Sequence, residues 1–74
     1  MGRLSPQPFR EIKRRLEAAG FVQVSQKGSH VKFARSRGPV VDLAVVPKKR
    51  EVPVGTLHSI LSQAHIGIDD WDAL

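Results

Sequence analysis

The chain has 74 residues, with 12 Lys and Arg against 7 Asp and Glu, a formal net charge of +5 and no cysteine. A chain of this length has room for one small domain with a single core, and the lack of cysteine excludes a disulfide framework and a thiolate zinc site. No apolar stretch approaches the roughly 18 residues of a membrane span, so we expect a soluble cytoplasmic protein in which residues 1–74 form one domain.

The segment Ser5-Pro6-Gln7-Pro8 predicts the start of a helix, with Ser5 as the N-cap and Pro6 at the first helical position. Apolar residues then recur at spacings of three and four, which places them on one face: Phe9, Ile12, Leu16 and Ala19. Gly20 is expected to end this helix, because glycine readily adopts the left-handed conformation of a helix C-terminus.

Three short strands are predicted to follow, over residues 21–26, 29–35 and 40–46. The segments between them, Lys27-Gly28 and 36–39, contain the glycine and proline typical of tight turns. Such short connections imply an antiparallel meander. In the third strand, alternation places one set of side chains on one face (Val41, Leu43 and Val45) and the other set on the opposite face (Val40, Asp42, Ala44 and Val46).

A second helix is predicted to begin between Pro53 and Thr56 and to end at Gly67, with one apolar face formed by Val54, Leu57, Ile60, Leu61 and Ala64. His58 and His65 are expected to be ordinary residues of the helix surface. The remaining residues form a short acidic tail around Trp71, which we expect to pack against the second helix.

The predicted order is α-β-β-β-α, which defines an α+β fold with a three-stranded antiparallel sheet. Two amphipathic helices can both bury their apolar faces only if they pack on the same face of the sheet. We therefore expect both helices on one face and the opposite face open to solvent.

Basic residues are concentrated in one part of the chain. All 12 Lys and Arg lie in the first 50 positions with only three acidic residues, so that this part carries a formal charge of +9. The last 24 residues hold four acidic residues and no Lys or Arg. Such a distribution favours a polyanionic partner, and nucleic acid is the commonest candidate.

One histidine in the second strand is the main candidate for chemistry. In the stretch from Gln26 to Phe33, strand alternation directs Val31 and Phe33 to the core and leaves His30 and Lys32 on the open face. Imidazole groups titrate near neutral pH and lysines attract phosphate, a combination that suits RNA cleavage. The spacing alone also fits, and favours, a histidine that only faces solvent, so both interpretations stay open at this point.

Several other chemistries are excluded. His58 and His65 are separated by about 10 Å along a helix axis and cannot share a metal ion, so no metal site is expected. Ser29 precedes His30 directly, and neighbours on a strand point to opposite faces, which argues against a Ser-His pair. The three phenylalanines are assigned to the core, so any RNA is expected to be held through its phosphates rather than by base stacking.

A series of motifs extends over nearly the whole chain: Leu16-Glu17-Ala18-Ala19-Gly20-Phe21, Gln26-Lys27-Gly28-Ser29-His30 with Phe33, Val46-Pro47, Gly55-Thr56-Leu57, Ile60-Leu61, Gln63-Ala64 and the ending at Trp71. In these motifs and their spacing the sequence resembles the HicA toxin family, the RNA-cleaving half of bacterial toxin–antitoxin pairs. The resemblance implies a fold similar to that of double-stranded-RNA-binding domains, in agreement with the order of elements above.

The resemblance also implies an activity: a metal-independent endoribonuclease that cleaves mRNA without a cofactor and is neutralised by a HicB-like antitoxin. The catalytic histidine of the family corresponds to His30, which would act as general base for attack of a 2′-hydroxyl on the adjacent phosphate. The residues expected to bind the RNA are Lys27, Ser29, Lys32, Lys48, Lys49 and Arg50. Many relatives carry a second histidine shortly after the proline that corresponds to Pro47, where this chain has Lys48 and Lys49, so the general acid stays open.

Two other interpretations compete with a toxin. A non-catalytic double-stranded-RNA-binding domain also has a Gly-x-His element between its first two strands, so Gly28 and His30 could contact a minor groove. That class holds phosphates with lysines at the start of its second helix, whereas the predicted second helix here contains no Lys or Arg. A structural or protein-interaction module would explain the apolar pattern but not the segregation of charge.

Overall fold

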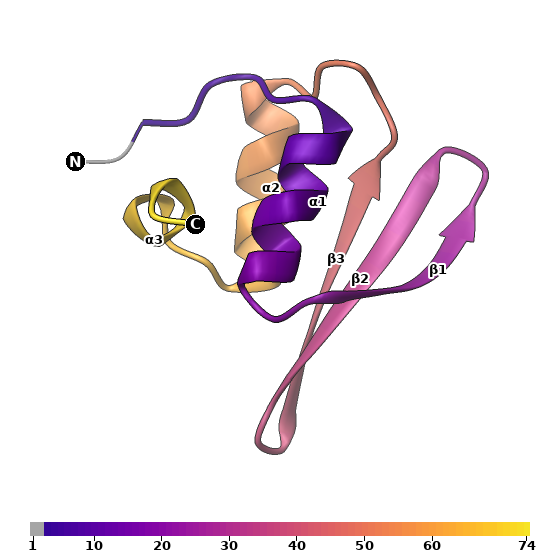
Figure 1. The fold of residues 1–74 in the computed structure, drawn as a ribbon, viewed down its shortest axis with the longest axis vertical. Helices are drawn as coiled ribbons and strands as arrows, with labels where there is room; N and C mark the ends of the chain where they lie inside the picture. Colours follow the sequence, from indigo (N-terminus) through magenta and orange to yellow (C-terminus); the bar gives the residue numbers. More distant parts are fainter. Residues whose placement is uncertain (1–2) are drawn as a thin grey trace.

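The computed structural model describes residues 3–74, and it confirms the predicted order of elements with one short helix added (Figure 1). The elements are α1 (Phe9–Ala18), β1 (Val22–Lys27), β2 (His30–Arg37), β3 (Val40–Pro47), α2 (Val54–Ala64) and α3 (Ile68–Asp72). None of the helices within residues 3–74 is long and apolar enough to cross a membrane.

The three strands form one antiparallel sheet in the order β1-β2-β3. Both hairpins turn through two residues, and the first of these is a glycine with positive φ: Gly28 at 59° and Gly38 at 58°. Glycine at the first position of a two-residue hairpin is typical of a type II′ turn, whose twist matches that of the strands. The turns set the register, which pairs Lys27 with His30 and Arg37 with Val40.

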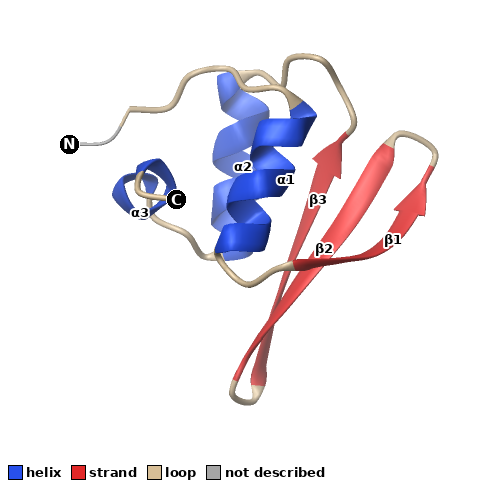
Figure 2. Cartoon of the chain, in the orientation of Figure 1, coloured by secondary structure: helices blue, strands red, loops and turns tan. Residues whose placement is uncertain are grey.

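Helices α1 and α2 lie on the same side of the sheet, as predicted, and α3 lies beyond them on the side away from the sheet (Figure 2). The side chains of the sheet that point away from the helices are consequently exposed. Among them are His30 and Lys32 on β2, whose neighbours Val31 and Phe33 are buried. The prediction of an open face that carries His30 is therefore confirmed.

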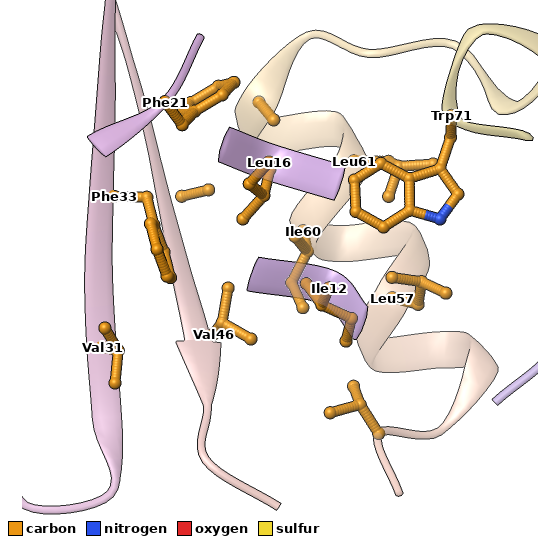
Figure 3. Packing of buried hydrophobic residues seen from close by; sticks show 13 residues of the cluster. Ile12, Leu16, Phe21, Val31, Phe33, Val46, Leu57, Ile60, Leu61 and Trp71 are labelled. Atoms are coloured by element: carbon orange, nitrogen blue, oxygen red, sulfur yellow. The ribbon is translucent and has the colours of Figure 1, made fainter. Parts of the chain in front are cut away.

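The core fills the space between the sheet and the helices (Figure 3). Its buried residues are Ile12, Leu16, Phe21, Val31, Phe33, Ala44, Val46, Val52, Leu57, Ile60, Leu61, Ala64 and Trp71. Phe33 and Val31 reach it from the sheet, and Trp71 reaches it from α3 beside Leu61. The tail of the chain is thus part of the core, with Trp71 fully buried, and this indole is not available to a partner.

The predicted start of the first helix is wrong by three residues: the N-cap is Pro8 rather than Ser5. Gln7 is extended and exchanges both backbone hydrogen bonds with Val52, and Pro8 is extended as well and precedes the helix. A residue before proline disfavours the helical conformation, which keeps Gln7 out of the helix. The end is as predicted: Gly20 has φ 98°, and the amides of Gly20 and Phe21 donate to the carbonyls of Glu17 and Leu16 in a Schellman motif.

The predicted end of the second helix is also wrong. α2 ends at Ala64, and His65 rather than a glycine adopts the left-handed conformation, with φ 56°. The amide of Ile66 then donates to the carbonyl of Leu61, again as in a Schellman motif. Gly67 has a different role, since it is the N-cap of α3.

Candidate functional site

His30 is the first residue of β2 and comes directly after the Gly28-Ser29 turn. It lies between Lys27 on β1 and Pro47 on β3, and its side chain is exposed. Because paired residues of antiparallel strands share a face, Lys27 and His30 present their side chains to the same side of the sheet. Lys32 follows on that face two residues later. The structure therefore brings together three of the predicted site residues on the open face.

The turn that positions His30 depends on Gly28. We expect Gly28→Ala to lower the free energy of unfolding by about 1–2 kcal/mol, because a Cβ disfavours a φ of 59° even where no atom lies within 4 Å of it. Gly55→Ala is the matched control, since Gly55 lies in α2, has equal space around it and has no positive φ. Urea denaturation of the two variants tests this, and equal stability of both would contradict the type II′ assignment.

The segment after β3 is tied to the turn that carries His30. The amide of Lys48 donates a hydrogen bond to the carbonyl of Ser29 at 2.6 Å, and the carbonyl of Lys49 accepts one from the amide of Phe9 at 3.0 Å. The start of α1, the β3–α2 segment and the β1–β2 turn accordingly lie at one end of the molecule (Figure 1). These backbone contacts connect Lys48, Lys49 and Arg50 to the element that holds His30.

Ion pairs divide the basic residues into two groups. Those that pair with Glu11, Glu17 or Asp42 are Lys13, Arg14, Arg15, Arg35 and Arg37. Those whose side chains form no ion pair in the described part of the chain are Arg3, Arg10, Lys27, Lys32, Lys48, Lys49 and Arg50, although the backbone amide of Arg3 donates to the Asp72 carboxylate. All five lysines and arginines that the sequence assigned to RNA binding belong to the unpaired group.

The pairing on α1 involves Glu11 above all. Hydrogen bonds from Arg14 and then Arg15 lower the pKa of Glu11 from 4.5 to about 2. These two arginines are therefore engaged with a carboxylate, whereas Arg10, one turn earlier on the same helix, has no carboxylate partner within residues 3–74.

Arg10 and Phe9 are site candidates that the sequence analysis missed. Together with Pro8, Lys48, Lys49 and Arg50 they line an open pocket of about 490 Å³ between the start of α1 and the β3–α2 segment. Phe9 is only half-buried, and the Lys48 Nζ lies 6.0 Å from the centre of its ring. The sequence signal for this pocket was weak, because the helical spacing of Phe9 assigned it to the core.

A second missed feature is a buried carboxylate. Asp42 is almost fully buried and accepts hydrogen bonds from Arg35, Arg37 and His65, the last at 2.8 Å from Nδ1. His65 does lie on the surface, as expected, with its side chain 63% exposed, but it is not an ordinary surface residue because it bonds to this buried carboxylate. Arg35 also donates to the carbonyls of Ala19 and Ala64, which end α1 and α2. This cluster joins the sheet to the ends of both helices and lies away from the turn of His30.

The open face also carries exposed apolar side chains beyond His30 and Lys32. They are Val22, Val24, Val41, Leu43 and Val45, with exposures between 36% and 60%. The register pairs Val45 with Lys32, which places this apolar patch next to the basic end of the same face.

The described residues hold no group of three His, Cys, Asp or Glu side chains that could bind a metal ion. His58 lies exposed on α2 and His65 is bonded to Asp42, so neither is a partner for His30. What the site offers is one exposed imidazole and a set of unpaired cations that extends from the open face to the pocket. Such a site can move a proton and stabilise phosphate charge.

The fold and the site define a small basic α+β domain with a histidine at a hairpin turn. The family model described as "HicA toxin of bacterial toxin-antitoxin" matches residues 9–66, which includes α1, the whole sheet and α2. The chain therefore belongs to the HicA toxin family, and as a toxin of a toxin–antitoxin system it has a cognate antitoxin as partner. No curated protein gives a significant match to the chain.

Proposed function

We propose that this toxin is an endoribonuclease that cleaves mRNA without a metal ion, with His30 as the general base. The observation that carries the proposal is the position of His30: an exposed imidazole between Lys27 and Lys32, on an element bonded to the Lys48–Arg50 segment. A site for RNA cleavage needs a base that reaches the substrate and cations that hold its phosphates, and this end of the molecule has both.

In the proposed reaction His30 accepts the proton of a ribose 2′-hydroxyl, whose oxygen then attacks the adjacent phosphorus. The bond from phosphorus to the 5′-oxygen breaks, which leaves a 2′,3′-cyclic phosphate and a 5′-hydroxyl end. Lys27, Lys32 and the Lys48–Arg50 segment stabilise the added charge of the phosphorane, and Ser29 holds the turn through its carbonyl bond to Lys48. With no second histidine at hand, the 5′-oxygen takes its proton from water or a lysine, so we expect a slow enzyme.

The antitoxin in this proposal is HicB-like and covers the open face. A partner that shields His30 meets unpaired lysines at one end of this face. Along the rest of the face it meets the exposed apolar patch of Val22, Val24, Val41, Leu43 and Val45. An acidic surface with an apolar centre complements both features.

The proposal is tested with the purified toxin and a labelled RNA in EDTA. We expect cleavage that persists without divalent metal, gives cyclic-phosphate ends and stops when the 2′-hydroxyl at the cleaved position is replaced by hydrogen. The rate under subsaturating conditions should fall with salt, because each phosphate contact on a single strand contributes a slope of about −0.7 in a log–log plot. Tight binding without any cleavage would reject the enzyme and favour a non-catalytic double-stranded-RNA-binding module.

A further inference from the structure

The pocket between the start of α1 and the Lys48–Arg50 segment has the size of a ligand site and a lining rich in cations. Its volume of about 490 Å³ lies within the range of about 300–1,000 Å³ that is usual for small-molecule sites. We propose that it binds one unpaired nucleotide of a single-stranded RNA, with the base stacked on Phe9 and the neighbouring phosphates on Arg10, Lys48, Lys49 and Arg50. This inference rests on the proposed function only in taking RNA as the ligand.

Phe9 is placed as a stacking surface. Its ring packs against Phe33 with 6.4 Å between ring centres, so it is anchored by the core. The ring also lines the pocket and is partly exposed, with the Lys48 Nζ over the ring at 6.0 Å from its centre. An aromatic ring held in this way lets a base stack on it without loss of side-chain freedom, and stacking accepts any base.

The charges around the ring call for an anion. Four cations line the pocket, and none of them has a carboxylate partner within residues 3–74. Elsewhere on α1 the cations do have such partners: Lys13 pairs with Glu17, and Arg14 with Glu11. Like charges gathered without compensation repel one another, and a phosphate backbone relieves that repulsion.

The pocket is continuous with the element that carries His30. A backbone hydrogen bond from the amide of Phe9 to the carbonyl of Lys49 joins the two segments that line the pocket. A second one, from the amide of Lys48 to the carbonyl of Ser29, joins the Lys48–Arg50 segment to the turn before His30. A strand with its scissile phosphate at His30 can therefore continue over this end of the sheet into the pocket. In a duplex the bases are paired and stacked inside the helix, so only an unpaired base can reach the ring of Phe9.

The test measures binding in the His30→Ala background, so that it does not depend on cleavage. Fluorescence anisotropy compares one short labelled RNA as a single strand and as a duplex. We expect tighter binding of the single strand. Arg10→Gln should weaken it about fivefold and reduce the salt slope by about 0.7. Phe9→Leu should weaken it about fivefold or more with the salt slope unchanged, because stacking is not an ionic contact.

The matched control is Arg14→Gln, which removes the same charge from the same helix at a residue paired with Glu11. It should change the affinity less than twofold. Equal effects of Arg10→Gln and Arg14→Gln, or a preference for the duplex, would overturn the inference. So would an unchanged affinity of Phe9→Leu, with circular dichroism confirming that the variant is folded. A failure of wild-type cleavage with these binding effects intact would reject the proposed nuclease and not this site.

Discussion

His30→Ala is expected to lower the rate of RNA cleavage by about 10²- to 10⁴-fold, the usual contribution of a positioned general base. Its affinity for RNA should stay within about twofold, because the phosphates are held by lysines and arginines that the substitution leaves in place. The burial pattern supports this separation: His30 is exposed and bonds to no other side chain within residues 3–74, so its loss does not disturb the core. Single-turnover assays on the unmodified RNA measure the rate of cleavage. Binding assays on an RNA with a 2′-deoxy substitution at the cleaved position, which cannot be cut, measure the affinity.

His58→Ala is the control for this experiment. His58 is exposed on α2, outside the basic end of the molecule, and its removal should leave both cleavage and binding unchanged. Substantial cleavage by His30→Ala would show that another group takes the proton. A parallel loss of cleavage and affinity would assign His30 to binding instead of proton transfer.

Asp42→Asn is expected to cause the largest loss of stability among single polar substitutions, with a fall of at least about 10 °C in the midpoint of thermal unfolding. Asp42 is buried, and its carboxylate compensates Arg35 and Arg37 and accepts from His65. Without the negative charge, the partly buried Arg35 stays next to the core with no counterion. Removal of one member of a buried ion pair is costly for this reason.

Calorimetry or thermal circular dichroism measures this effect, with Glu51→Gln as the control because Glu51 lies exposed in the β3–α2 segment. A similar midpoint for both variants would contradict a structural role of the cluster. A strong loss with Asp42→Asn and a weak one with Arg37→Gln would fit the geometry, since the side chain of Arg37 is 47% exposed and can turn to solvent.

The same cluster predicts how stability depends on pH. Hydrogen bonds from Arg37 above all, and then from Arg35 and His65, hold the pKa of Asp42 well below its ordinary value of 3.8, although burial alone would raise it. A carboxylate with a lowered pKa contributes its full stabilisation above that ordinary value and loses it as the pH falls toward the folded-state value. The difference in stability between the parent and Asp42→Asn should therefore be constant near neutral pH and shrink below about pH 4.

Much of the fold could be predicted because it is encoded by neighbouring residues. Apolar spacing on α1 and α2, glycines in two tight turns and alternation along β2 are local patterns. Each of them indicates a type of secondary structure and the face that it buries. Together they set the order of elements, the single helix-covered face and the exposure of His30. The exposure of His30 was thus predictable before any contact between distant segments was considered, and the resemblance to the HicA family made it the candidate base.

Only the tertiary structure decided the features that depend on distant partners. The pairing of Gln7 with Val52 adds to the local effect of Pro8 in keeping Gln7 out of α1, and the role of His65 is set by Asp42, 23 positions earlier. The pocket likewise exists because residues 8–10 and 48–50 meet across the fold. Periodicity assigns a residue to a face of its own helix or strand. A contact between two such elements forms only if the whole fold brings them together, and this does not follow from the periodicity of either one. That is why His30 could be found from the sequence and the pocket around Phe9 and Arg10 could not.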